Sequence, residues 1–253
     1  EKEGTTMVDT NLERAALAAI AAQPEKRVLP LTYENKRYYI KRRLANGRNA
    51  FAKSGTDTAF YREVYKILAV NARIPLAPHI EILHDDFFLM NASGMPLQSV
   101  AAALPAEEAV SVYYNAGKAL AELHSRNLWH GRPALRDITW DKKTGKITFL
   151  DWENKVPFIK TDYRITDLFL LLHSCFREEW PTEDLIDATV EGYKSVASEA
   201  RRFMEVRSFI NEHRRFFSIC RSLSAFHWID VVSVTMTAAY ICKITAERQT
   251  EPL

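Results

Sequence analysis

The spacing of apolar positions divides the chain into a first part rich in strands and a second part rich in helices. Residues 11–23 form an alanine-rich run that favours a helix. Residues 27–33 and 36–43 alternate apolar and polar positions, and Glu34-Asn35 between them predicts a hairpin turn. In the second of these strands, the alternation places Lys41 on the face opposite to Ile40.

A helix and two more strands are expected before the chain changes character. Residues 58–70 are amphipathic, with Glu63 as the one acid inside them and an apolar stripe of Phe60, Val64, Ile67 and Leu68. Residues 79–83 and 86–90 have the composition of short strands. The sequence then becomes small and polar, so we place a domain boundary near Asn91. Residues 1–91 form the first domain, with 1–10 as a tail, and residues 92–253 form the second.

The second domain is expected to be mainly helical. Residues 105–124 predict a long helix whose buried stripe is Ala109, Val112, Tyr113, Ala116, Leu120 and Leu123. Residues 168–176 are apolar on nearly every face, which predicts a central helix that begins at Thr166-Asp167. Further helices are expected from residue 182 onward, and the apolar run 229–244 predicts a buried one. The fold class is therefore α+β, with a small sheet followed by a helical region.

Residues 124–153 contain the polar groups most typical of a reactive site. His130, Arg132, Asp137 and Asp151 occur there within a short distance of one another. Asp151 follows an apolar strand, and a carboxylate at a strand end is held by rigid backbone while it still faces a cleft. This arrangement suits a metal ligand better than a surface acid does.

The motif HGRPALRD…LDWE in this stretch resembles the protein-kinase superfamily. Its variant form is similar to the lipopolysaccharide-kinase group, which phosphorylates heptose or Kdo sugars of the lipid A–core. The resemblance extends over residues 27–176. It implies a two-lobed protein-kinase-like fold with a small N-terminal sheet lobe, a larger mainly helical C-terminal lobe, and ATP bound between them.

The resemblance assigns nucleotide-binding roles to residues of the first domain. Lys41, in YYIK, matches the strand lysine that reaches the α- and β-phosphates, and Glu63 matches the helix glutamate that pairs with it. The backbone of Met90 and Ala92, at the expected hinge, would bind adenine. For Lys41 and Glu63 taken alone, solvated strand and helix charges are the plainer interpretation.

The resemblance assigns the metal ligands and catalytic groups to the second domain. Asp151 matches the principal Mg²⁺ ligand, and Asp137, 14 residues earlier (151 − 137), stands where the family has a metal-binding Asn. Arg132 departs from the family, because it occupies the position of the catalytic Asp. Two roles are open to Asp137. It is a second Mg²⁺ ligand, or Arg136-Asp137 acts as a displaced Arg-Asp pair in which Asp137 orients the acceptor hydroxyl while Arg132 stabilises the transferring phosphate.

Two neighbouring side chains are expected to support this loop. The family histidine that corresponds to His130 is structural, so we do not assign His130 as a base. Asp167 resembles the helix carboxylate that binds the backbone of the catalytic loop, although a simple N-cap also fits its position.

The chain also departs from the family in two loops. No glycine-rich GxGxxG precedes Lys41; a loop after that strand holds Gly47, Arg48, Lys53 and Gly55, and either shields phosphates, meets an anionic acceptor or merely connects two elements. The segment between Glu153 and Asp167 is shorter than the activation segment of regulated protein kinases. That shortness favours a small-molecule or glycolipid kinase.

Composition limits the compartment and the partners. The net charge is +2, so no strong field indicates a nucleic-acid partner. The three cysteines are far apart in apolar runs, which predicts reduced core thiols. With no visible signal peptide, we expect a cytoplasmic protein. Arginines within residues 199–217 alternate with glutamates and form either a solvated face or a contact with anionic lipid at the inner membrane.

These observations predict an ATP-dependent phosphotransferase of lipopolysaccharide biosynthesis. ATP and Mg²⁺ would be the cofactors, and a sugar hydroxyl of the lipopolysaccharide core or a related glycolipid would be the acceptor. Two alternatives remain: a catalytically inactive nucleotide-binding relative that acts by interaction, and an atypical protein kinase.

Overall fold

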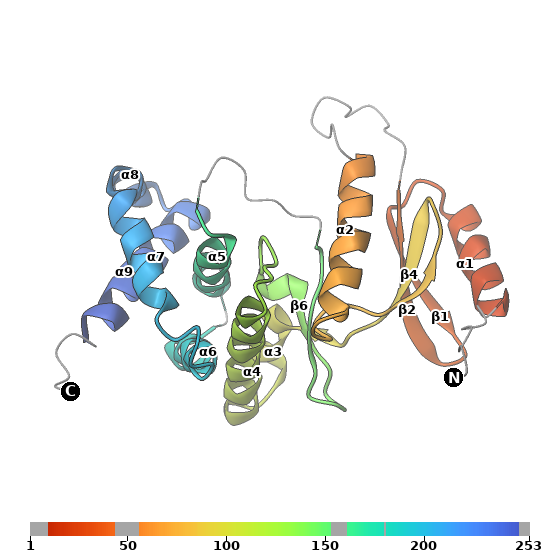
Figure 1. Ribbon diagram of the computed structural model, residues 1–253, viewed down its shortest axis with the longest axis horizontal. Coiled ribbons are helices and arrows are strands. Elements are labelled where there is room, and N and C mark those ends of the chain that lie inside the picture. Colours follow the sequence, from red (N-terminus) through yellow and green to blue (C-terminus); the bar gives the residue numbers. More distant parts are fainter. Residues whose placement is uncertain (1–9, 44–55, 153–160, 180, 248–253) are drawn as a thin grey trace. The chain divides into compact units, whose positions relative to one another are not determined.

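The computed structural model describes residues 10–43, 56–152, 161–179 and 181–247 (Figure 1). It is an α+β structure that divides into two compact units, Glu1–Ser93 and Gly94–Leu253. Residues 1–9 of the predicted tail, Glu153, and the loop with Gly47, Arg48, Lys53 and Gly55 lie outside the described residues. The tail was predicted to end at residue 10, which is wrong for Thr10, because this residue is the first of a helix.

A four-stranded antiparallel sheet forms the centre of the first unit. Its strand order is β1 (Val28–Tyr33), β2 (Lys36–Arg42), β4 (Phe87–Asn91) and β3 (Ile80–Leu83). The predicted hairpin is confirmed, and its turn residues Glu34 and Asn35 both have positive φ, 47° and 60°. Two consecutive positive φ angles are what a tight hairpin turn between right-twisted strands requires.

Two helices cover opposite faces of this sheet (Figure 1). α1 (Thr10–Ala22) packs on the face that carries Ile40, in a core that also contains Leu12, Ala16, Leu29 and Leu89. α2 (Thr56–Asn71) packs on the other face, where the ring centroids of Phe60 and Phe88 are 5.6 Å apart. Because side chains alternate along β2, Lys41 lies on the face toward α2.

The apolar stripe predicted for α2 is confirmed at Phe60, Val64 and Ile67, which are buried. The prediction is wrong for Leu68, which is 51% exposed. Leu68 follows Ile67 directly, and each step along a helix turns the side chain by about 100°, so it points away from the sheet. Glu63 lies on the buried side of the same helix.

The second unit begins with two helices and a small sheet. The helices are α3 (Leu97–Ala103) and α4 (Ala106–Ser125), and the strands are β5 (Met95–Pro96), β6 (Ile138–Trp140) and β7 (Ile147–Phe149). Every residue of the stripe predicted for α4 is buried. Gly94, at the entrance to β5, has φ 115°, and a Cβ there would overlap the carbonyl of Trp140. Only glycine therefore lets the chain pass beside β6 at this point.

Five helices complete the second unit: α5 (Tyr163–Arg177), α6 (Glu183–Lys194), α7 (Arg202–Glu212), α8 (Arg214–Leu223) and α9 (Ile229–Glu247). The start predicted for α5 at Thr166-Asp167 is wrong. Asp162 is its N-cap, and the Asp162 carboxylate accepts the N–H of Arg164. The apolar run 168–176 is thus the middle and end of a longer helix.

The last helix, α9, is long and apolar enough to cross a membrane by length and composition alone. Its window Ile229–Ala246 has a mean hydropathy of 1.4, and 28% of that window is buried. One such helix is weak evidence for a span, because core helices pass the same test. α9 packs against α5, α7 and α8 with one side, so the prediction of a buried helix is wrong for most of its surface.

Candidate functional site

A buried ion pair connects β2 to α2 in the first unit. Lys41 Nζ lies 2.8 Å from Glu63 Oε1 and 2.7 Å from Glu63 Oε2. The two side chains are only 8% and 2% exposed. Removing both charges from water is costly, and a buried pair of this kind adds little stability compared with apolar side chains of similar volume. The expected pairing is confirmed, and the role of the pair in binding phosphates stays a prediction.

The expected hinge residues lie at the end of the same sheet. Met90 pairs with Tyr39 of β2, and the N–H of Ala92 donates to the carbonyl of Arg37 at 3.0 Å. The Ala92 N–H is therefore part of the sheet. An adenine bound there would have to donate to the carbonyl oxygen of Ala92. Adenine binding by Met90 and Ala92 stays a prediction.

In the second unit, Asp167 holds the start of the loop that carries the HGR motif. Its fully buried carboxylate accepts the backbone N–H of His130 at 2.6 Å and that of Gly131 at 2.8 Å. Gly131 has φ 105°, a conformation that favours glycine. Asp167 lies inside α5, so the alternative of a simple N-cap is wrong. The contact expected from the resemblance, from a helix carboxylate to the loop backbone, is confirmed.

A second buried side chain, His124 at the end of α4, supports Asp167. Its Nε2 lies 3.4 Å from Asp167 Oδ2, and its Nδ1 lies 2.7 Å from the hydroxyl of Tyr193. Because a carboxylate can only accept, we assign a ring hydrogen to Nε2, and Nδ1 then accepts the hydroxyl hydrogen of Tyr193, whose pKa is raised by burial. The Nε2 hydrogen of His124 is then directed at Asp167, which leaves that carboxylate with three donors.

His130 is a structural histidine, as the sequence analysis expects. Its Nε2 lies 2.6 Å from the carbonyl of Leu150, and its Nδ1 accepts the N–H of Arg132 at 3.3 Å. A carbonyl can only accept, so the ring proton is on Nε2. The ring is buried and lies 4.6 Å from that of Trp152. Both nitrogens are used by the backbone, which excludes His130 as a proton acceptor for a substrate in this conformation.

The end of β7 is fixed to the 3₁₀ turn η1 (Leu135–Asp137). The N–H of Leu150 donates to the carbonyl of Asp137 at 2.6 Å, and the Leu150 carbonyl accepts from His130. Asp151 then takes φ 60°, a left-handed conformation that is uncommon for residues other than glycine and often occurs at functional sites. These bonds determine where the carboxylates of Asp137 and Asp151 lie.

The guanidinium of Arg132 lies between these two carboxylates. Arg132 Nη2 is 3.4 Å from Asp151 Oδ2 and 3.9 Å from Asp137 Oδ2. The Asp137 side chain is 13% exposed and that of Asp151 is 26% exposed, so the pair is accessible to a ligand but largely enclosed. The structure therefore brings together the three residues predicted for metal binding and catalysis.

Two carboxylates that converge on one cation also fit the coordination of Mg²⁺. This ion is usually bound by one or two carboxylates together with substrate phosphates and waters, rather than by a complete set of protein ligands. Within the described residues, no group of three or more His, Cys, Asp or Glu side chains could hold a metal. Asp137 and Asp151 would thus need phosphate oxygens to complete the coordination.

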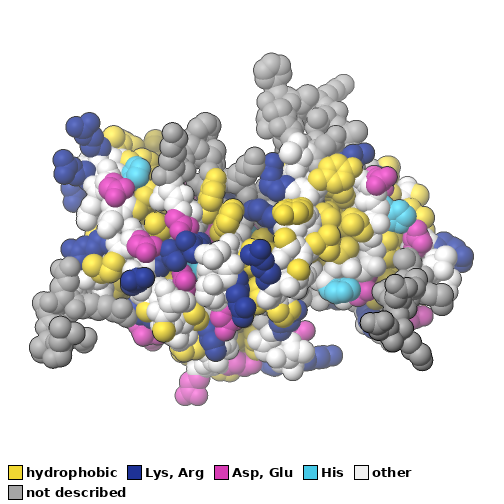
Figure 2. Space-filling model, in the orientation of Figure 1, with side chains coloured by type: hydrophobic (Ala, Val, Ile, Leu, Met, Phe, Trp, Pro, Cys, Tyr) yellow, Lys and Arg dark blue, Asp and Glu magenta, His cyan; other side chains and the backbone are white. Residues whose placement is uncertain are grey.

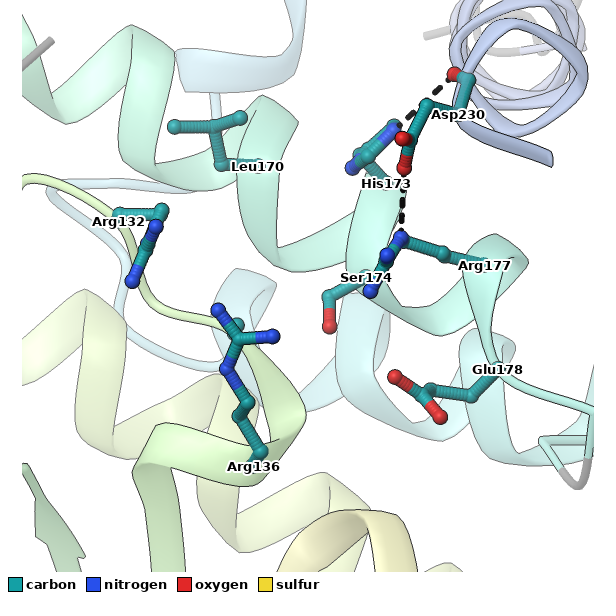
Figure 3. A pocket seen from close by; sticks show the side chains of 9 residues that line it. Arg132, Arg136, Leu170, His173, Ser174, Arg177, Glu178 and Asp230 are labelled. Carbon is teal, nitrogen blue, oxygen red and sulfur yellow. Dashed lines mark hydrogen bonds and ion pairs between the residues drawn. The ribbon is translucent and has the colours of Figure 1, made fainter. Parts of the chain in front are cut away.

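A pocket of about 250 Å³ opens beside Arg132 in the second unit (Figure 3). Its wall is formed by the loop after Gly131, by α5, and by Asp230 at the start of α9. The charged and polar side chains that line it are Arg132, Arg136, His173, Ser174, Arg177, Glu178 and Asp230.

Two residues of this set, Arg132 and Arg136, belong to the HGRPALRD motif and were singled out from the sequence. The others come from segments far apart in the chain, which the motif does not connect. One signal was present: His173 and Ser174 interrupt the apolar run 168–176. Ser174 Oγ accepts the N–H of Leu135 at 2.9 Å, so this polar position on α5 supports the 3₁₀ turn that carries Asp137.

Comparison with known proteins gives a near full-length relative but no activity. No family model matches the chain. An uncharacterized protein of Haemophilus influenzae is 26% identical over 232 residues, which cover 90% of this chain and 95% of that protein. The similarity thus extends across both units, beyond the HGRPALRD…LDWE stretch. Because that protein is uncharacterized, the chemistry of the site has to be inferred from the residues described above.

Proposed function

We propose that this protein is an ATP-dependent phosphotransferase with a protein-kinase-like fold. The observation that carries the proposal is the buried Lys41–Glu63 pair, on the strand and the helix where the resemblance requires it. Such a pair contributes little to stability. It suits a lysine that must be held in one position to bind phosphate oxygens.

The loop geometry of the second unit supports the same proposal. Phosphoryl transfer depends mainly on positioning and on electrostatic stabilisation of the transferring group. Asp137 and Asp151 would hold Mg²⁺, which would neutralise the phosphates when bound. Lys41 would contact the α- and β-phosphates of the same nucleotide. Arg132 would stabilise the charge on the transferring phosphate, and Asp167 and His130 keep the loop backbone in place.

We propose a sugar hydroxyl of the lipopolysaccharide core, or of a related glycolipid, as the acceptor. The support is the similarity of HGRPALRD…LDWE to the lipopolysaccharide-kinase group. Arg132 in place of a catalytic carboxylate is compatible with this chemistry, because a loose transition state requires little deprotonation of the attacking hydroxyl.

A lipid-linked acceptor would bring the protein to the cytoplasmic face of the inner membrane as a peripheral partner. Residues 213–229 include three arginines and no acid. Several large apolar side chains there are exposed: Phe216, Ile219, Phe226, Trp228 and Ile229. In Figure 2, basic and hydrophobic side chains lie next to each other over the end of α8. Aromatic and basic side chains together suit the surface of an anionic bilayer.

The inactive-relative alternative is favoured by one specific observation. The guanidinium of Arg132 lies where it neutralises both Asp137 and Asp151, so it would compete with Mg²⁺ for them. A protein of this kind would bind nucleotide without transferring phosphate.

Turnover of ATP in the presence of Mg²⁺ and a panel of acceptors distinguishes the two functions. The panel contains lipopolysaccharide core oligosaccharides, their glycolipid precursors and a generic protein substrate. For the phosphotransferase we expect acceptor-dependent ADP release, abolished in Lys41→Met and strongly reduced in Glu63→Gln. Nucleotide binding with no transfer to any acceptor would establish the inactive relative instead. Absence of both binding and transfer would end the kinase-like proposal.

A further inference from the structure

The pocket beside Arg132 has the composition of an anion-binding site. Three guanidinium groups line it, from Arg132, Arg136 and Arg177, against the carboxylates of Glu178 and Asp230. Burial lowers the pKa of His173, the remaining titratable group, so its ring is neutral at physiological pH. Counted by themselves, the lining residues therefore carry one positive charge in excess, while Arg132 and Arg136 also face the carboxylates of Asp137 and Asp151 outside the lining.

Arg136 and Arg177 have guanidinium groups available to a ligand, whereas that of Arg132 lies between Asp137 and Asp151. Arg177 bonds Asp230 Oδ1 through its Nε at 2.6 Å, which leaves the hydrogens on Nη1 and Nη2. Arg136 is half-exposed, and its Nε lies 3.7 Å from Asp137 Oδ1, a loose contact. In Figure 3 the two guanidinium groups lie on either side of Ser174. Two like charges at one pocket favour an anion between them.

Ser174 adds a neutral donor at the same place. Its Oγ accepts the N–H of Leu135, and its own hydroxyl hydrogen can rotate toward a ligand in the pocket. The combination of two guanidinium groups and one hydroxyl matches a tetrahedral phosphate or a carboxylate, both of which accept several short hydrogen bonds.

We infer that this pocket binds an anionic group of the acceptor, a phosphate ester or a carboxylate, through Arg136, Arg177 and Ser174. The inference rests on the proposed phosphotransferase function. The pocket shares Arg132 with the Asp137–Asp151 pair, so an acceptor anchored there by its anion presents a neighbouring hydroxyl beside those carboxylates. The acceptor is thus an alcohol that already carries a negative charge, rather than a neutral sugar.

The test measures binding to the full-length protein by calorimetry or NMR titration, without requiring turnover. The probes are glucose 6-phosphate, glucuronate and neutral glucose, at constant ionic strength. We expect one or both anionic sugars to bind at least tenfold more tightly than glucose. The stronger of the two identifies phosphate or carboxylate as the preferred group.

Three variants connect this binding to the pocket. Arg136→Gln and Arg177→Gln should each lower the affinity for the anionic sugar by about tenfold to a hundredfold, which is the cost of losing a hydrogen bond to a charged group. Asp230→Asn is the matched control, because it breaks the same ion pair as Arg177→Gln but removes a competing negative charge. It should leave the affinity equal or higher. If Arg177 served only to hold α9 in place, Arg177→Gln and Asp230→Asn would lower the affinity equally.

Two results would overturn the inference. One is equal affinity for glucose and both anionic sugars; the other is unchanged anion affinity in Arg136→Gln, a half-exposed position where folding is not at risk. Neither depends on ATP. If the anion binds as expected but no acceptor is phosphorylated, the phosphotransferase proposal fails while the subsite remains. If turnover occurs with equal kcat/KM for neutral and anionic acceptors, the subsite fails alone.

Discussion

Arg132 is the residue that most affects how this site is interpreted. It occupies the position at which the kinases that the motif resembles have a catalytic carboxylate, and the structure shows its guanidinium in contact with Asp151 and near Asp137. Like charges on two adjacent carboxylates repel, and one cation between them relieves that repulsion. Under the proposed function, Arg132 and Mg²⁺ would therefore compete for the same two side chains.

This competition gives a prediction with two opposite signs. In Arg132→Ala we expect Mg²⁺-dependent nucleotide affinity to rise, because a competing cation is lost, and turnover to fall, because the transferring phosphate loses a positive charge. Titration with Mg²⁺–nucleotide and steady-state kinetics measure the two effects. Lys142→Ala, which removes an exposed cation paired with Glu108, is the control and should change neither. Unchanged turnover in Arg132→Ala would exclude a catalytic role.

Asp137 has two roles open to it, and two substitutions separate them. Asp137→Asn restores the metal ligand that the related kinases use, so substantial turnover should remain if Asp137 binds Mg²⁺. Asp137→Ala should then lose both Mg²⁺–nucleotide affinity and turnover. If Asp137 orients the acceptor, both variants should keep nucleotide affinity while turnover is lost. Nucleotide titration at fixed Mg²⁺, combined with single-turnover kinetics, distinguishes the two patterns.

The residues of the site divide into those that the sequence could show and those that it could not. Lys41, Glu63, Asp137, Asp151 and Asp167 were all predicted, because each has a fixed order within a recognisable motif. Ser174, Arg177 and Asp230 were not, because their place in the pocket depends on how α5 and the start of α9 pack, and no local pattern encodes that packing.

At the scale of elements, local patterns predicted most helices and strands. The hairpin at Glu34-Asn35 and the buried stripe of α4 needed only near-neighbour information. The predicted start of α5 was wrong because both Asp162 and Thr166-Asp167 have the composition of an N-cap. Burial of Asp167 against the HGR loop, a contact across 37 residues, decides between them.

The observed N-cap of α5 predicts a measurable stability effect. The Asp162 carboxylate accepts the N–H of Arg164 and pairs with its guanidinium. Asp162→Ala should cost about 1 kcal/mol of unfolding free energy through the lost cap. Asp162→Asn, which keeps a capping side chain, should cost less. Chemical denaturation of the three proteins measures this, and equal loss in both variants would show that charge, not capping, matters.

The same group predicts a pH dependence. Hydrogen bonds from Arg164 hold the pKa of Asp162 below its usual value of 3.8. Stability from this carboxylate is therefore complete above pH 3.8, and it is lost as the pH falls through the lower, folded-state pKa. The difference in unfolding free energy between wild type and Asp162→Asn should shrink across this range. A constant difference down to pH 2.5 would contradict the contact.

At the scale of the whole molecule, the two units divide the work proposed for the protein. The first contains a sheet with the Lys41–Glu63 pair, and the second contains the HGR loop, the Asp137 and Asp151 carboxylates and the arginine-lined pocket. The similarity to the Haemophilus influenzae protein covers both units.

The surface formed by residues 213–229 gives the last prediction, which concerns the membrane. Phe216, Ile219 and Trp228 are 56%, 58% and 59% exposed, so packing within the unit leaves more than half of each side chain uncovered. The arginines of this segment would add attraction to anionic lipid of about 1 kcal/mol each, reduced by salt. We therefore expect the protein to float with vesicles containing phosphatidylglycerol, and less with phosphatidylcholine alone.

The triple variant Phe216→Ser, Ile219→Ser, Trp228→Ser should lose most of this binding, because the apolar contact with the acyl region is removed. Its matched control is Tyr65→Ser with Leu68→Ser, which removes exposed apolar side chains from α2, where Tyr65 is 73% and Leu68 is 51% exposed. The control should float like wild type. Equal flotation with neutral and anionic vesicles would exclude a role for the arginines, and unchanged binding of the triple variant would exclude this surface. Binding that survives both tests would require a different contact, and residues 123–136 are a second candidate, because they contain three arginines and no acid and expose Trp129 at 40%.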